Sequence, residues 1–327
     1  MFTNKKLKLG TRGSPLALKQ AEWVKKKIKN NFFELDIEIV KIKTYGDKLP
    51  DKPLSEFSKN DMFTKEIEEA LLKEKIDIGV HSMKDVPVNI SDELIIAAIT
   101  KREDPRDVLV SKKGKLQELP LNSTVGTSSL RRKAQVLNFR KDLVIKDIRG
   151  NVDTRLKKLE NENFDAIILA AAGLIRLGLK DKITEFIPFE IILPDAGQGA
   201  LGIQIRKNDD TTKNIVSFLN DEDSEYTVSA ERRFVKTIGA SCRFPVAAYA
   251  EIINPPSPPF NKGGLGEFTD KKLKLTGLIA TEDGKTVIKD ETEGNRDEFN
   301  KIGISLAENI LNKGGKEILE MITHING

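Results

Sequence analysis

Cysteine and histidine are almost absent from this sequence. Its one cysteine, Cys242, excludes a disulfide within the chain, and it is accompanied by only two histidines, His81 and His324. Thiolate and imidazole groups are the ligands that zinc and iron–sulfur centres prefer. We therefore expect no metal site.

Long apolar runs are missing as well. Residues 1–10 contain alternating lysine and leucine without the apolar core of a signal peptide, and the longest strongly apolar stretch, 166–175, is half the length that spans a bilayer. The 54 basic and 50 acidic residues nearly cancel, so the chain lacks the cationic excess of a nucleic-acid or membrane binder. We expect a cytoplasmic protein that binds neither.

Apolar residues are nevertheless plentiful, because they make up 39% of 327 residues, which is enough for two or three domain cores. Up to about residue 220, strand-like segments alternate with helical ones, a pattern typical of open, mostly parallel sheets. One helix is expected to be capped by Ser14, with Pro15 at its first position. The expected strands lie at 6–9, 35–42, 76–80, 124–126, 143–148 and 166–171.

Two segments have the composition of crossings between lobes. Residues 101–107 are charged and contain a proline, and residues 193–202 contain a proline and three glycines. The sequence therefore predicts a first lobe made of residues 1–100 and 198–219 and a second lobe made of residues 101–197. A body with two lobes has a cleft between them, which is the usual place for a ligand.

A third, smaller unit of helices and strands is expected at residues 220–327. It contains a low-complexity insert, at about 254–267, that is rich in proline and glycine and is expected to be a solvated loop. The other predicted elements are a helix capped by Ser224, strands at 246–253 and 273–279, and a helix at 299–311.

Arginine is concentrated at the predicted strand-to-helix junctions, although the chain has 40 lysines and only 14 arginines. Such junctions line the ligand crevice of open α/β sheets, and a guanidinium group can bind a carboxylate through two parallel hydrogen bonds. Any one of these arginines could instead be a solvated surface residue, but together they predict a ligand with several negative groups. They are Arg12, Arg131, Arg132, Arg149, Arg155 and Arg176.

One carboxylate follows the predicted strand at 76–80. Asp85 and its neighbour Lys84 lie past the carboxyl end of that strand, at the mouth of the anion-binding cleft. A carboxylate there would repel the ligand, so it fits a reaction that develops positive charge or needs a proton delivered. The alternative that the residue type leaves open is that Asp85 caps a turn or pairs with Lys84.

Cys242 lies in a predicted loop at 239–245. A lone cysteine is ordinarily a small buried apolar residue, but the neighbouring Arg243 favours the thiolate. The position therefore fits a nucleophile or a point of covalent attachment. A cysteine hydrolase would need a catalytic histidine as partner of the cysteine, and no such histidine is recognisable in the sequence.

Six segments, in their order along the chain, resemble the porphobilinogen deaminase family, also called the hydroxymethylbilane synthase family. The resemblance implies an α/β fold with two periplasmic-binding-protein-like lobes, whose sheets are mixed and mostly parallel, and a smaller α+β C-terminal domain that carries the cysteine. We also expect a monomer. The matching segments are 11–18, 80–87, 126–132, 148–156, 196–202 and the Cys242 loop.

The same resemblance implies a transferase of haem and other tetrapyrrole biosynthesis. Members join four porphobilinogen units head to tail onto a dipyrromethane cofactor, with loss of ammonia from each, and release hydroxymethylbilane by hydrolysis. Cys242 matches the cysteine that holds this cofactor through a thioether, and Asp85 matches the catalytic aspartate that assists loss of the amine and stabilises the azafulvene-type cation. Cofactor contacts are matched by Lys84, Ser129, Arg131 and Arg132, and contacts to substrate carboxylates by Arg12, Ser14, Arg149, Arg155 and Arg176.

Some segments depart from the family pattern. Residues 58–62 replace a glycine-rich run of the family, and Ala240, Ser241 and Arg243 differ from the residues common beside the cysteine. Two other functions stay open: a non-catalytic two-lobed binding protein for a small dicarboxylate, and a homologue that is degraded or regulatory. The first gives no role to Cys242, and the second conflicts with the presence of every charged site residue.

Overall fold

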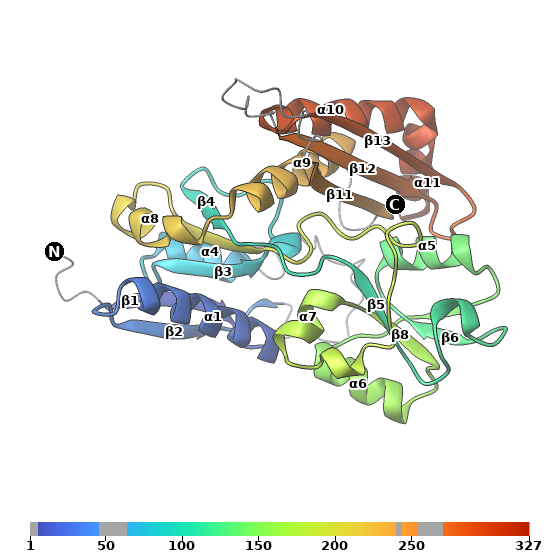
Figure 1. Cartoon of the computed structure of the whole chain (residues 1–327), viewed down its shortest axis with the longest axis horizontal. Coiled ribbons are helices and arrows are strands. Elements are labelled where there is room, and N and C mark those ends of the chain that lie inside the picture. The colour runs from blue at the N-terminus through green and yellow to red at the C-terminus, as the bar shows by residue number, and fades with distance from the viewer. Residues whose placement is uncertain (1–5, 46–63, 240–243, 254–270, 327) are drawn as a thin grey trace, which may run out of the picture.

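Three β-sheets organise the chain (Figure 1). The computed structural model describes residues 6–45, 64–239, 244–253 and 271–326. Cys242 with its neighbours, the departure at 58–62 and the insert at 254–267 lie outside the described residues.

The first sheet has the strand order β2-β1-β3-β10-β4. Four of its strands run in one direction, because β1 is parallel to β2 and β3, and β10 is antiparallel to both β3 and β4. Its helices are α1 (Pro15–Asn31), α4 (Lys65–Leu72) and α8 (Asp210–Val216). Its strands are β1 (Leu7–Arg12), β2 (Ile37–Ile42), β3 (Ile78–Ser82), β4 (Leu94–Ile99) and β10 (Leu201–Arg206).

The second sheet repeats this plan in the order β7-β6-β8-β5-β9. Here β5 is the strand of opposite direction, since it is antiparallel to both β8 and β9. The accompanying helices are α5 (Leu130–Phe139), α6 (Val152–Asn161) and α7 (Ala171–Arg176). The strands are β5 (Asp107–Ser111), β6 (Thr124–Gly126), β7 (Val144–Lys146), β8 (Ala166–Ala170) and β9 (Glu185–Phe186).

The chain passes between these two sheets twice. The outward connection, residues 100–106, joins β4 to β5, and the return connection, residues 187–200, joins β9 to β10. The predicted crossings at 101–107 and 193–202 fall largely in these connections. The predicted α/β class, with mixed and mostly parallel sheets, is confirmed.

The third sheet, β11-β12-β13, is antiparallel and belongs to a smaller α+β unit. Helices α9 and α10 pack on it so closely that a Cβ added at Gly277 would lie 2.6 Å from Phe234 and 3.0 Å from Leu306. In Figure 1 this unit lies above the two lobes. Its elements are α9 (Glu222–Ile238), β11 (Val246–Ile253), β12 (Lys272–Ala280), β13 (Val287–Asn295), α10 (Phe299–Ile310) and α11 (Lys316–Asn326).

Short helical turns complete the structure. The one that bears on function is η2 (Met83–Asp85), which follows β3 directly. The others are η3 (Leu116–Glu118), η4 (Lys180–Lys182), η5 (Ser217–Leu219), η6 (Arg296–Glu298) and η7 (Leu311–Gly315).

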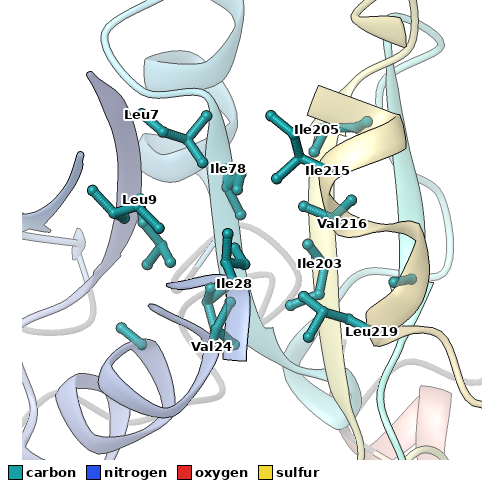
Figure 2. Packing of buried hydrophobic residues seen from close by; sticks show 14 of the residues in the cluster. Leu7, Leu9, Val24, Ile28, Ile78, Ile203, Ile205, Ile215, Val216 and Leu219 are labelled. Atoms are coloured by element: carbon teal, nitrogen blue, oxygen red, sulfur yellow. The ribbon is translucent and has the colours of Figure 1, made fainter. Parts of the chain in front are cut away.

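The core of the first lobe forms because α1 presents one apolar face to the sheet. The Ser14 hydroxyl accepts a hydrogen bond from the Ala17 amide at 3.3 Å and so caps α1, with a proline at the first helical position, as predicted. Val24 and Ile28 then pack on one face of the sheet, and Ile215 and Val216 of α8 join the same cluster, which Figure 2 shows. Helix α4 packs on the opposite face, because a Cβ added at Gly79 would lie 3.0 Å from Ile67. Burial of each large side chain contributes about 1.5–3 kcal/mol to folding.

Several predicted boundaries are wrong. β1 extends through Arg12 instead of ending at residue 9, and β3 includes His81 and Ser82, which were expected to follow the strand. Ser224 does not cap α9: the cap is Asp221, whose carboxylate accepts from the Ser224 amide at 2.9 Å, because its oxygen reaches the first free amides of the helix.

Candidate active site

A pocket lies where β1 and β3 end. These strands are parallel, so their carboxyl ends meet at one edge of the first sheet. The pocket has a volume of about 60 Å³. Four charged or polar side chains that line it come from the ends of the two strands and the turns that follow them: Arg12, Ser14, Ser82 and Asp85.

Asp85 reaches the pocket because η2 is anchored beneath it. Met83 is 1% exposed and packs in an apolar cluster with Val86 and Val228, which fixes the turn from which Asp85 lines the pocket. The Lys84 ammonium donates to the Gln198 side-chain oxygen at 3.3 Å. Among the described residues no ion pair joins Lys84 to Asp85, which removes the pairing alternative there.

The Lys84 ammonium lies near both positively and negatively charged side chains. Burial lowers its pKa, and the positive charge of Arg132 lowers it further, whereas the carboxylates of Asp85, Asp195 and Asp107 raise it. Lys84 therefore lies close enough to the second lobe to sense its charges.

His81 forms part of the pocket wall without acting as a cation. Its Nε2 atom lies 3.0 Å from the side-chain oxygen of Gln204, and burial lowers its pKa to about 4, with a further lowering by Arg12. At neutral pH the imidazole is therefore neutral.

Arg131 and Arg132 are buried in the first turn of α5, and both bind Asp107. The distances from their guanidinium nitrogens to the Asp107 oxygens are 2.8 and 2.7 Å. Although burial by itself would raise the pKa of Asp107, the two guanidinium groups hold it well below its usual range. The Nε atoms of both arginines are buried and have no hydrogen-bond partner within the described part of the chain. Ser129 caps α5, its hydroxyl accepting from the Arg132 amide at 3.5 Å.

Arg149 and Arg155 lie beside this pair. The Ser128 hydroxyl donates to the Ile148 carbonyl at 2.9 Å and accepts from the Ile148 amide at 3.1 Å, which holds the two junctions together. Burial lowers the pKa of Arg155 to about 10, and repulsion by Arg132 and Arg149 contributes to this lowering. Arg155 is still charged at neutral pH, so three guanidinium groups repel one another here.

Arg176 differs from the prediction, because it is the last residue of α7 and not part of a strand-to-helix loop. Its guanidinium donates to the Gly199 carbonyl of the return connection at 2.6 Å. Burial lowers its pKa to about 10, against an opposite effect of Glu103. Helix α7 also contacts α1, since a Cβ added at Gly173 would lie 3.6 Å from Leu16.

The cations of both lobes fit a ligand that carries several carboxylates. Repulsion among Arg132, Arg149 and Arg155, and the buried Nε atoms without partners, would both be relieved by such a group. Dipyrromethane, with its acidic side chains, satisfies this requirement. In the described ranges no three or more His, Cys, Asp or Glu side chains gather as metal ligands would.

Three important residues were missed at the sequence level. Gln20 lines the pocket and donates to the Ser82 hydroxyl at 3.0 Å, and Asp107 and Gln198 connect the cations. Asp107 and Gln198 do fall in the two predicted crossings, which was the available signal. Their partners could not be named because they lie far away along the chain.

No helix in the described ranges is both long and apolar enough to cross a membrane.

Comparison with known proteins identifies the family. Residues 7–214 match the family model "Porphobilinogen deaminase, dipyromethane cofactor binding domain", and residues 225–312 match "Porphobilinogen deaminase, C-terminal domain". The chain is 46% identical over 315 residues to porphobilinogen deaminase of Geotalea uraniireducens, covering 96% of this chain and 94% of the relative. It is 43% identical over 318 residues to that of Pelobacter propionicus, covering 97% of each. Among solved structures, the methionine-binding protein MetQ is similar with a TM-score of 0.42 and 16% identity, covering 69% of this chain and 94% of that one. The chain belongs to the porphobilinogen deaminase family.

Proposed function

We propose that this chain is an enzyme that joins four porphobilinogen units head to tail and releases hydroxymethylbilane for tetrapyrrole biosynthesis. The observation that carries the proposal is the match of residues 7–214 and 225–312 to the two family domains. The site supports it, because one carboxylate, Asp85, lines a pocket of the first lobe while arginines gather at the neighbouring junctions.

We assign the dipyrromethane cofactor to Cys242 through a thioether, with Lys84, Ser129, Arg131 and Arg132 as its contacts. When bound, the cofactor supplies the free pyrrole end onto which substrate is added. The buried Nε atoms of Arg131 and Arg132 support these contacts, because they need hydrogen-bond acceptors.

We assign the carboxylates of the substrate to a second set of residues. Each pyrrole unit carries two carboxylates, and a planar guanidinium can bind each through two hydrogen bonds. The mutual repulsion at Arg155 supports an anion there. The set consists of Arg12, Ser14, Arg149, Arg155 and Arg176.

Asp85 has a different task in this proposal. In each addition the C–N bond of the substrate breaks and the amine leaves as ammonia. The free α-carbon of the next pyrrole forms the new C–C bond, and its C–H bond breaks with release of a proton. Positive charge builds up on the substrate as the amine departs, and a nearby carboxylate stabilises that charge. Asp85 also delivers a proton to the departing amine and accepts the proton that the attacking pyrrole carbon releases.

The proposed domains are a first lobe of residues 1–100 and 198–219, a second lobe of 101–197, and a C-terminal domain of 220–327. The membership of β10 in the first sheet supports the return of the chain to the first lobe. We propose a cytoplasmic monomer. Light scattering of the purified protein is expected to give the mass of one chain, and a dimer mass would contradict this part of the proposal.

The deciding experiment is the intact mass of freshly purified, active protein. It is expected to exceed the sequence mass by one dipyrromethane unit, and the protein should colour with Ehrlich's reagent for pyrroles. Cys242→Ser is expected to lose both signals. Active wild-type protein with an unmodified Cys242 would overturn the proposal, and calorimetric binding of a dicarboxylate without turnover would favour a binding protein instead.

A further inference from the structure

The return connection carries a buried polar side chain that has no role in the function proposed above. Gln198 is 1% exposed and lies between Gly197 and Gly199. Both glycines have positive φ, +75° and +95°, and a Cβ added at Gly197 would lie 2.9 Å from Met83. The backbone therefore passes close to η2, and only glycine permits this approach without strain.

Both ends of the Gln198 amide are bound. Its nitrogen donates to the Pro105 carbonyl at 2.7 Å and to an Asp107 oxygen at 2.9 Å. Its oxygen accepts from the Lys84 ammonium at 3.3 Å. A single side chain thus contacts the turn that bears Asp85 on one side and the first strand of the second sheet on the other.

The same Asp107 carboxylate holds Arg131 and Arg132. Lys84, Gln198, Asp107 and the two arginines form one continuous chain of polar contacts across the two lobes. Each link is a hydrogen bond or an ion pair between side chains that are buried or partly buried, where such contacts are strongest.

We propose that Gln198 is a positioning residue for the carboxylates of the ligand, because it fixes Lys84 of the first lobe relative to Arg131 and Arg132 of the second. It touches no reacting atom and acts through Lys84 and Asp107. A ligand whose carboxylates bind both lobes then meets cations at a set separation. The role in turnover rests on the proposed function, whereas the contact with Lys84 does not.

The chemistry of the amide explains why glutamine suits this place. One end must donate to a carboxylate and the other must accept from an ammonium, and a primary amide does both. Glutamate would place a second carboxylate against Asp107. Methionine has a similar length but makes neither hydrogen bond.

The first test is a double-mutant cycle on turnover by the holoenzyme. Gln198→Met and Lys84→Met are each expected to lower kcat/KM for porphobilinogen, the former about tenfold to a hundredfold, as for loss of a hydrogen bond to a charged group. If Gln198 acts through Lys84, the double variant should be little worse than Lys84→Met alone. In the control cycle, which pairs Gln198→Met with Arg155→Met, the fold-losses in kcat/KM of the two single variants should multiply in the double variant. Effects that multiply in the Gln198–Lys84 cycle would overturn the proposal.

The second test does not depend on turnover. Trace acylation with acetic anhydride, followed by peptide mass spectrometry, reports the reactivity of the Lys84 amine. Since the Gln198 oxygen stabilises the ammonium form, Gln198→Met is expected to speed the labelling of Lys84 at least threefold, and Gln198→Glu should slow it. Changes in the same direction for both variants, or an unchanged rate in the first, would overturn the proposal.

Gln135→Met is the matched control for a general loosening of the core. Gln135 is also buried, at 4% exposure, but its amide binds only main-chain atoms of Arg131 and Leu193. The Gln135→Met variant should be labelled at Lys84 at the wild-type rate. If it speeds the labelling of Lys84 as much as Gln198→Met does, a specific role of Gln198 is refuted. If the wild-type protein makes no bilane, the proposed function fails while the labelling result still decides the contact.

Discussion

The arginines of the site differ in their electrostatic surroundings. Arg131 and Arg132 share the buried carboxylate of Asp107, so their charges are largely compensated within the protein. Arg155 has the repulsion of Arg132 and Arg149 and no carboxylate among the influences on its pKa. We infer that the first pair organises the site and that Arg155 contributes more of the attraction for an anionic ligand.

Asp85→Asn tests the role of the pocket carboxylate. Asparagine keeps the size of the side chain but carries no negative charge and cannot exchange a proton. The variant is expected to retain the cofactor mass while ammonia release from porphobilinogen falls about 10²- to 10⁴-fold. The exposed Asp92→Asn is the control and should turn over normally. Turnover near the wild-type rate in Asp85→Asn would remove Asp85 from its role.

The lowered pKa of His81 should make the stability of the protein depend on pH. Its pKa is about 4 in the folded protein, lowered mainly by burial, against about 6.5 for an ordinary histidine. Between these values the unfolded chain binds a proton that the folded protein does not. The free energy of unfolding should therefore fall as pH decreases from about 6.5 to 4, by about 3 kcal/mol from this group.

Urea denaturation across that pH range measures the effect. His81→Gln cannot take up the proton, so its unfolding free energy should depend less steeply on pH than that of the wild type. Parallel curves for the two proteins would show that His81 does not contribute.

At the scale of elements, the return connection is constrained more than its loop-like sequence suggests. A Cβ added at Gly199 would clash with the Glu103 carbonyl of the outward connection, and φ is +95° there. Gly178 also has a positive φ, +75°, but an added Cβ would have no atom within 4 Å. Alanine at Gly178 would therefore suffer backbone strain alone, whereas alanine at Gly199 would suffer both backbone strain and a steric clash.

Gly199→Ala is accordingly expected to lower the free energy of unfolding more than Gly178→Ala does. Gly178→Ala, the control, should cost only about 1 kcal/mol, because alanine must adopt a left-handed conformation there. Gly199→Ala should cost about 3 kcal/mol or more in total, because the added Cβ also displaces the backbone. Thermal and urea unfolding of both variants measure the difference. Equal losses would contradict the close packing of the two connections.

The elements predicted well were those with strong local signals. α1 has a serine cap and a proline at its first position, and β11 matches its predicted range, 246–253. β4 was missed because its six residues are apolar throughout and show no alternation. β13 was missed for the opposite reason: it is an edge strand with many charged residues and little burial.

At the scale of the whole molecule, the C-terminal unit contacts both lobes. Val228 of α9 packs against Met83 in the first lobe, and Leu278 of β12 packs in a cluster with Ala134 and Leu193 of the second. This unit precedes and follows the Cys242 loop in the chain. The contacts of this unit with the two lobes therefore fix the positions of α9 and β11, which precede and follow Cys242 in the chain.

A buried ion pair joins the unit to both connections. The Arg102 guanidinium of the outward connection binds Glu231 of α9 at 2.6 and 3.1 Å. The same carboxylate accepts from the amides of Gly197 and Ala250, at 2.7 and 2.8 Å. Burial raises the pKa of Glu231, and the charge of Arg102 opposes that rise.

Glu231→Gln is expected to lower the free energy of unfolding by about 3–5 kcal/mol, because it leaves the Arg102 charge buried without a counterion. Glu222→Gln, at an exposed carboxylate that binds Arg296, is the control and should cost about 1 kcal/mol or less. Denaturant unfolding followed by fluorescence compares them. Similar small losses in both variants would mean that the buried pair does not hold the unit in place.

The sequence alone determined the class of fold, the family and the types of residue at the site. Caps, periodicity and motifs are local in the chain, so Asp85, the arginine junctions and the two crossings could be found without coordinates. Tertiary structure decided which charges meet. Asp107 with Arg131 and Arg132, Gln198 with Lys84, and Glu231 with Arg102 are separated by 24 to 129 positions. Such pairings depend on how sheets and connections pack, and no local pattern of residues encodes them.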